Sequence, residues 1–152
     1  MHKLLTLEDY WMDRDQKFRG EWVQQIQRNG AETVRRINLL VPMWLANGIE
    51  LHKHPQGFGA WSSGWRPKAV NSSTPNAAVM SNHMQATAGD IFDPEGDIDE
   101  WCFLHQHIIG SPDTDLYMEH PSATKGWCHL QTVPPKSQQK FPPENRRRWF
   151  YP

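Results

Sequence analysis

The sequence contains little cysteine and shows no excess of charge of either sign. Its two cysteines, Cys102 and Cys128, stand far apart in a chain of 152 residues, which favours two buried thiols in a reducing compartment over a disulfide framework. Sixteen basic residues face seventeen acidic ones, so no overall positive field would attract nucleic acid. The one run of charge, Arg146–Arg148, is interpreted as a solvated surface.

Long apolar runs are also missing. The N-terminal stretch MHKLLTLEDYW is too polar for a signal peptide, and no later stretch approaches the roughly 20 apolar residues of a membrane-spanning helix. We therefore expect a soluble chain that is made in the cytoplasm and has neither a membrane span nor a nucleic-acid partner.

Tryptophan and proline, in contrast, are abundant, with eight and twelve residues. A polar chain with a few very large apolar side chains is typical of a compact domain rich in loops, and this length suffices for one core. We expect a single domain over residues 1–152. Residues 1–48 would form a helical scaffold, 49–136 the core that carries the candidate metal site, and 137–152 a C-terminal tail.

The first third of the chain is predicted to be helical. Thr6 precedes acidic residues and predicts a capped helix over residues 7–12. Between residues 21 and 46, apolar side chains recur at spacings of three and four, which indicates an amphipathic helix. Gly30 weakens its middle and Pro42 kinks or ends it, so the segment can be two helices that stop at Asn47-Gly48.

After residue 49, short apolar bursts alternate with turn residues. The stretches GFGAWSSGW, KAVNSSTPNA and ATAGDIFDPEGD predict strands and long loops, and two more strands are predicted over 116–119 and 127–131. A helix over 98–108, capped by Asp97, is inserted among them. The tail from Pro134 is expected to wrap the surface, with aromatic anchors at 149–151. This order predicts an α+β fold with an antiparallel sheet.

Two potential metal ligands lie in the stretch SNHMQATAGD. Mostly small residues separate His83 from Asp90; they would make a poor core but would let the backbone run close to a bound group. A third candidate is His129 in the predicted strand GWCHLQ, where it shares a face with Trp127 and Gln131. Two imidazoles and one carboxylate are a ligand set that suits a catalytic Zn²⁺.

Neighbouring residues receive other roles. Cys128 points away from the face of His129, so we expect a core thiol and not a ligand. Arg66, in SGWRP, could place a fixed positive charge where an oxyanion develops or where a substrate carboxylate binds. Trp65 and Trp127 adjoin the supposed site, and we expect both to line its cleft.

Three motifs, taken in order, resemble those of the zinc D-alanyl-D-alanine peptidases. They are SGWRP, then S-x-H with an aspartate seven residues beyond the histidine, then W-x-H. That family belongs to a wider group with lysostaphin-type enzymes and the hedgehog signalling domain. The chain is most similar to small phage and prophage members, which also carry a segment like EHPSATKGWCHLQTVPP. The resemblance covers roughly residues 5–136.

The resemblance implies a hedgehog/DD-peptidase-like fold, in which a small antiparallel sheet and N-terminal helices surround one catalytic zinc. It implies His83, Asp90 and His129 as the zinc ligands, Arg66 as the substrate-polarising residue, and Ser81 as a support of the site. The implied activity is hydrolysis of peptide bonds in the peptidoglycan stem. The enzyme would be a D,D-carboxypeptidase or endopeptidase, phage-encoded as an endolysin or as a virion-associated cell-wall peptidase.

Two positions depart from the family pattern. Ala86 replaces a usual glycine, which is the mildest replacement. Relatives also often place an acidic residue three before the last histidine ligand, or a histidine two before it, and these positions hold Gly126 and Trp127 here. Glu119, on the preceding predicted strand, is our candidate for the general base, since it could face the metal across the hairpin while His120 points away.

The missing acid and the tail RRRWFYP motivate an alternative from a different class. The chain could be a structural virion protein, such as a tail or connector subunit, that retains the peptidase fold with weak or no activity and binds other phage virion proteins. As an enzyme, it would act at the bacterial cell wall after release or as part of a virion.

The remaining candidates are given structural roles. His52 and His54 lie in a loop with proline and glycine, and we interpret them as solvated. His105 and His107 do not share a face of the predicted helix and are assigned to its surface. The run DPEGDIDE lacks the glycine spacing and closing glutamate of an EF-hand, so it is interpreted as a helix cap with a solvated acidic turn.

Overall fold

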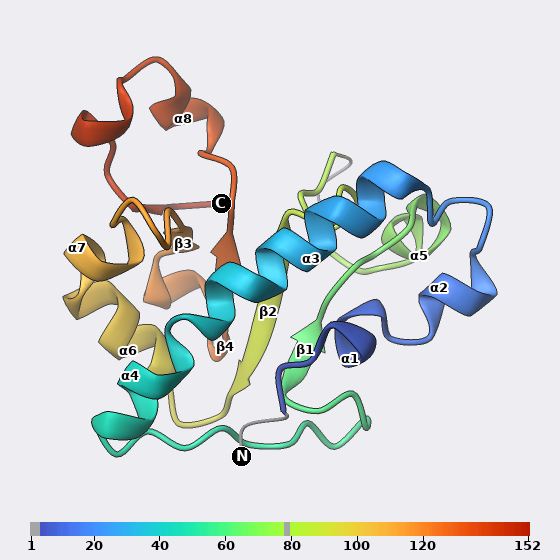
Figure 1. Cartoon of the computed structure of the whole chain (residues 1–152), viewed down its shortest axis with the longest axis horizontal. Helices are drawn as coiled ribbons and strands as arrows, with labels where there is room; N and C mark the ends of the chain where they lie inside the picture. Colours follow the sequence, from blue (N-terminus) through green and yellow to red (C-terminus); the bar gives the residue numbers. More distant parts are fainter. Residues whose placement is uncertain (1–3, 78–79) are drawn as a thin grey trace.

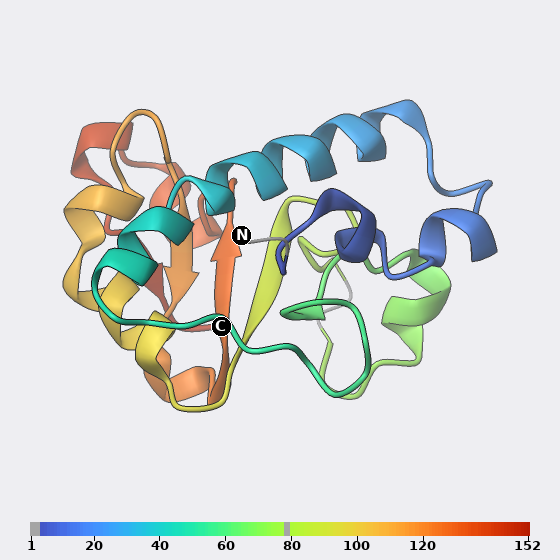
Figure 2. The same cartoon turned by 60° about the horizontal axis from the view of Figure 1, so that its bottom comes forward.

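The computed structural model describes residues 4–77 and 80–152 and has an α+β fold, as predicted (Figure 1). Five strands form one open sheet in the order β1-β2-β4-β3-β5. In both views the long helix α3 lies across one face of this sheet (Figures 1 and 2). Among the described residues, no helix combines the length and the apolar character that crossing a membrane requires.

The helices are short except for α3. In the described part of the chain they are α1 (Leu7–Trp11), α2 (Arg14–Lys17), α3 (Gln24–Asn38), α4 (Val41–Ala46), α5 (Lys68–Ser72), α6 (Asp97–Leu104), α7 (Gln106–Ile109) and α8 (Lys136–Gln139), with 3-10 turns η1 (Pro121–Ala123) and η2 (Pro143–Asn145).

The N-terminal helices confirm the prediction of a capped start and a break at proline. The Thr6 hydroxyl accepts a hydrogen bond from the Asp9 amide at 3.1 Å, and Pro42 lies in the first turn of α4, where its missing N–H costs nothing. Gly30 has a packing role, because a Cβ at this position would come within 2.4 Å of the Trp11 ring. The ring therefore packs directly against the α3 backbone.

The strands are β1 (Trp61–Ser63), β2 (Ala88–Asp93), β3 (Tyr117–Glu119), β4 (Gly126–Gln131) and β5 (Trp149–Phe150). The pairs β1–β2, β2–β4 and β3–β4 are antiparallel, as predicted, whereas β5 runs parallel to β3. The predicted surface tail thus ends as a strand of the sheet. A strand of two residues carries no periodicity of its own, so only its pairing partner defines it.

The two faces of the sheet separate the core from the site. Ile91 pairs with Cys128, and both side chains are fully buried in the core cluster. Asp90 pairs with His129, and each lies one residue along its strand from Ile91 or Cys128. The side chains of Asp90 and His129 therefore face the opposite side of the sheet. Cys102 and Cys128 are buried free thiols, as expected from the sequence.

Three local predictions were wrong. The stretch KAVNSSTPNA contains helix α5, in which Ser72 bonds back to the Lys68 carbonyl. The helix predicted over 98–108 is interrupted at His105, between α6 and α7. The run Arg146–Arg148 is solvated only in part: Arg147 is exposed, whereas Arg148 is only 9% exposed and binds the Asp115 carboxylate at 2.7 Å.

The acidic run also differs from its interpretation as a solvated turn. Gly96 precedes α6, and the carboxylate of Asp93 accepts the amides of Ile98 and Asp99 at 3.1 and 2.8 Å. The predicted cap, Asp97, makes no such bond. Asp93 and Asp99 are 3% and 2% exposed, and Asp99 accepts a hydrogen bond from the Thr124 hydroxyl. Two of the five acidic side chains in DPEGDIDE thus belong to the interior.

Asp99 makes the stability of the fold depend on pH. Burial, with the charges of Asp93 and Glu119, raises its pKa to about 7 although the Thr124 hydrogen bond lowers it. The folded chain therefore keeps a proton that the unfolded chain releases near its ordinary pKa of 3.8. By linkage, the contribution of Asp99 to stability is greatest below that value and falls as the pH rises towards about 7.

We predict that Asp99→Asn, which keeps the shape without the charge, gains stability relative to the wild type as the pH rises from about 4 to about 7. Urea unfolding across this range measures the difference. Asp97→Asn is the matched control, because Asp97 is exposed on the same helix. Equal pH dependence of the two variants would contradict the assignment.

Candidate metal centre

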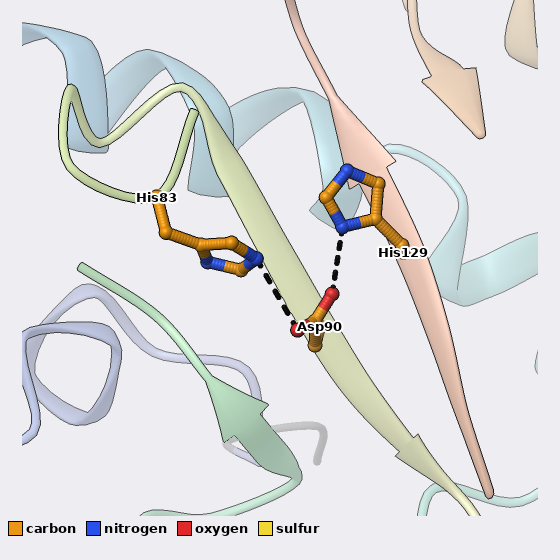
Figure 3. Close-up of side chains that lie close together, drawn as sticks. All are labelled: His83, Asp90 and His129. Carbon is orange, nitrogen blue, oxygen red and sulfur yellow. Dashed lines mark hydrogen bonds and ion pairs between the residues drawn. The ribbon is translucent and has the colours of Figure 1, made fainter. Parts of the chain in front are cut away.

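Three side chains that are distant in sequence meet on the open face of the sheet. His83 Nε2 lies 3.2 Å from Asp90 Oδ2, and His129 Nδ1 lies 2.8 Å from Asp90 Oδ1 (Figure 3). One ligand atom from each residue fits within a span of 4.8 Å. The three residues selected from the sequence thus form a cluster that could hold a metal ion.

The SGWRP turn orients His83. Its Nδ1 lies 2.9 Å from the carbonyl oxygen of Gly64, and because a carbonyl only accepts, Nδ1 carries the proton and Nε2 faces Asp90. Glycine is required at position 64, since a Cβ there would lie 2.0 Å from the Tyr10 carbonyl oxygen. The glycine of the motif therefore brings a carbonyl behind the histidine.

The next two residues of the motif point in different directions. Trp65 is 1% exposed and donates its Nε1–H to the Met84 carbonyl, so it belongs to the core and does not line the cleft as predicted. Arg66 donates its backbone N–H to the His83 carbonyl at 3.0 Å and holds its guanidinium 3.4 Å from Ser81 Oγ. Ser81 also accepts the His83 amide at 3.1 Å, which fixes the start of the histidine turn.

The small residues of SNHMQATAGD serve the core and not a bound group, contrary to the expectation. Ala86 and Ala88 are fully buried, and a Cβ on Gly89 would lie 2.7 Å from the Trp61 ring. Ala86 has a φ of 58°, a left-handed conformation that costs a residue with a Cβ about 1–2 kcal/mol. An alanine at this position therefore carries a backbone cost that the sequence did not indicate.

Gln131 is a site residue to which the sequence analysis gave no role. Its Oε1 lies 2.7 Å from His129 Nε2, and its Nε2 donates to the Val133 carbonyl at 2.7 Å. The Val133 carbonyl fixes which end of the amide faces His129, so His129 Nε2 donates its proton and Nδ1 is left for Asp90. The shared strand face of His129 and Gln131 was the sequence signal for this pair.

The charges of the cluster are strongly coupled. Burial raises the pKa of Asp90, but the charges and hydrogen bonds of His83 and His129 outweigh it and hold that pKa well below its usual range. Burial lowers the pKa of His129, while the hydrogen bond and charge of Asp90, with Glu119, raise it to about 9. At neutral pH His129 is therefore protonated, and a metal ion must displace the proton on Nδ1.

The cluster opens into a cavity of about 590 Å³. Arg66, Ser81, Glu119 and Trp127 line this cavity together with the three metal-ligand candidates. Glu119 Oε1 lies 3.7 Å from His129 Nδ1, so the side chain faces the cluster across the β3–β4 hairpin. Phe150 of β5 forms another part of the wall, which gives the tail a place at the site that the sequence did not indicate.

The other histidines of the described residues lie outside this cluster. His120 packs against the rings of Trp149 and Tyr151, as expected for a side chain that points away from the cavity. His105 stacks on Trp101, and His54 packs edge-on against Phe92. Packing contacts account for these three side chains.

The donor set tests whether a metal ion fits. Both imidazoles donate one ring N–H to a carbonyl or amide oxygen and direct the other nitrogen at the same carboxylate. Histidine ligands of metals are typically oriented in this way, because the outer acceptor fixes the tautomer. The residues present therefore fit a metal with two nitrogen ligands and one oxygen ligand.

We predict that Gln131→Met lowers the affinity for Zn²⁺ by about 10–100-fold, as is typical for the loss of an outer-shell partner. The variant keeps the side-chain volume but leaves the buried His129 Nε2–H without its acceptor, so the imidazole loses its fixed tautomer. Competition with a chromogenic chelator measures the affinity.

The matched control is Gln138→Met. Gln138 is also buried, and its amide accepts the Arg147 N–H at 3.0 Å outside the metal cavity. This substitution is expected to reduce stability and leave zinc affinity unchanged. Wild-type affinity in Gln131→Met would show that the glutamine does not orient His129.

No protein-family model, no curated protein and no solved structure gives a significant match to this chain.

Proposed function

We propose that the chain is a zinc-dependent hydrolase of peptide bonds. The observation that carries the proposal is the convergence of His83 Nε2, His129 Nδ1 and the Asp90 carboxylate at the wall of a cavity. Two histidines and one carboxylate are a ligand set that catalytic zinc sites use, with a further position left for water. Bound zinc supplies a water of lowered pKa and polarises the carbonyl of the substrate.

Glu119 is the proposed general base. The pair Met118–Leu130 in the β3–β4 register brings the next residue, Glu119, beside His129. The family position for an acid, three residues before His129, is Gly126, whose φ of 102° favours glycine. Backbone geometry therefore disfavours an acid at that position, and the carboxylate that lines the cavity comes from the neighbouring strand.

Arg66 is the proposed binder of negative charge. Burial lowers the pKa of its guanidinium and the charge of Asp90 raises it, yet an arginine stays protonated at any working pH. Its Nε is buried and has no hydrogen-bond partner among the described residues. Arg66 lines the cavity, where its charge would bind a substrate carboxylate or a developing oxyanion.

The proposed substrate is the peptide stem of peptidoglycan. This part of the proposal rests on three motifs that occur in the same order as in the D-alanyl-D-alanine peptidases: SGWRP, S-x-H with its aspartate, and W-x-H. We also propose that the chain has the hedgehog/DD-peptidase-like fold of that group. The enzyme would act as a D,D-carboxypeptidase or endopeptidase at the bacterial cell wall, phage-encoded as an endolysin or carried by a virion.

We predict that the zinc-loaded protein hydrolyses purified peptidoglycan and that His83→Ala loses both zinc and activity. Glu119→Gln is expected to keep zinc but lose about 100-fold or more of its rate, the usual contribution of a general base. Zinc content and release of peptide fragments, measured on the same samples, separate the two effects.

His52→Ala and Glu50→Gln are matched controls, because both residues are exposed and lie outside the cavity. Both should retain zinc and full activity. Wild-type activity in Glu119→Gln would contradict its role as the base. A zinc-loaded wild type without any hydrolysis, but in a stable complex with virion proteins, would support the structural alternative.

A further inference from the structure

A second hollow lies away from the metal cavity. It has a volume of about 640 Å³ and is formed by α7, the loop that follows it and the C-terminal segment around η2. Gly110, Asp115, Glu144, Arg146 and Arg148 are among its lining residues. Within the described residues, the two hollows share no lining residue.

Tyr117 brings two guanidinium groups together at the wall of this hollow. The Arg148 guanidinium lies over the Tyr117 ring, 4.4 Å from its centroid, and Arg146 Nη1 donates to the Tyr117 hydroxyl at 3.2 Å. Arg148 is 9% exposed. Gly110 makes room for it, since a Cβ there would lie 2.8 Å from Arg148 Cγ and 2.9 Å from its Nε.

The two arginines differ in how their charge is balanced. Arg148 pairs through Nη1 with Asp115 Oδ1 at 2.7 Å. Arg146 has only neutral acceptors among the described residues, because its Nε donates to the carbonyls of Gln138 and Phe141. Glu144 lines the same hollow but forms no ion pair with either arginine in the described part of the chain. One positive charge at the wall therefore remains unmatched.

Donor groups also remain available. Arg146 makes its protein hydrogen bonds through Nε and Nη1, and Arg148 makes its own through Nη1. Arg146 Nη2, Arg148 Nε and Arg148 Nη2 thus have no protein acceptor among the described residues. Guanidinium groups with free N–H donors match the oxygens of carboxylate and phosphate groups.

We propose that this hollow is a binding site for an oxyanion, a phosphate or carboxylate group of a ligand, held by Arg146 and Arg148. The site is independent of the metal centre and of the proposed hydrolase function, because the two hollows share no lining residue in the described part of the chain. The ligand would neutralise Arg146 and occupy the free guanidinium donors.

The test is a titration of the full chain with inorganic phosphate and, separately, with acetate, followed by ¹H–¹⁵N NMR that includes the arginine Nε–H signals. Sodium chloride at matched ionic strength is the reference. We expect saturable shifts of the Arg148 Nε–H and of amides in 106–115 and 143–148 with at least one probe. The probe that binds more tightly distinguishes a phosphate from a carboxylate ligand.

Arg146→Gln should weaken this binding about tenfold or more, since a hydrogen bond to a charged partner is lost with the charge. Gly110→Ala is a second variant, which crowds Arg148 without removing either charge, and it should also weaken binding. Arg147→Gln is the control, because Arg147 stacks on Trp149 and does not line the hollow. Shifts that do not saturate, or equal weakening by Arg146→Gln and Arg147→Gln, would overturn the proposal.

Discussion

The site depends on two hydrogen bonds, each made by the histidine ring nitrogen that is not directed at Asp90. The Gly64 carbonyl holds the Nδ1–H of His83, and the Gln131 amide oxygen holds the Nε2–H of His129. Each bond leaves the other ring nitrogen directed at one oxygen of Asp90. The candidate metal centre arises because two rings on different elements direct different nitrogens, Nε2 of His83 and Nδ1 of His129, at one carboxylate.

The core provides the precision that this arrangement needs. Gly64 can present its carbonyl because the chain passes directly over the Tyr10 backbone, where no side chain would fit. The turn that carries His83 ends at Ala86 in a left-handed conformation, and β2 then begins beneath Trp61. The conformational cost at Ala86 is offset by the packing of its fully buried side chain and by the Thr33 hydroxyl, which donates to its carbonyl.

The sequence predicted those parts of the site that local patterns encode. Alternation in GWCHLQ correctly separated Cys128, in the core, from His129, on the open face. Glu119 was expected to face the metal across the hairpin, and it lies beside His129. Both inferences used only the period of a strand and the pairing of two neighbouring strands.

Features set by tertiary contacts were not predictable in this way. Trp65 adjoins Arg66 in sequence, yet it packs into the core, where its ring contacts the ring of Trp11 edge to face. Asp93 and Asp99 belong to an acidic run that looks solvated, and only the packing of α6 against the sheet buries them. The tail forms β5 because β3 offers a free edge, which no pattern in RRRWFYP indicates.

The central claim, a metal centre built on opposite histidine tautomers, is tested most directly by anomalous diffraction at the zinc edge from crystals grown with Zn²⁺. We predict a single strong peak bound by His83 Nε2, His129 Nδ1 and the Asp90 carboxylate, beside Glu119. A crystal with no peak at this position, or a metal bound to His129 through Nε2 with Gln131 displaced, would contradict the account.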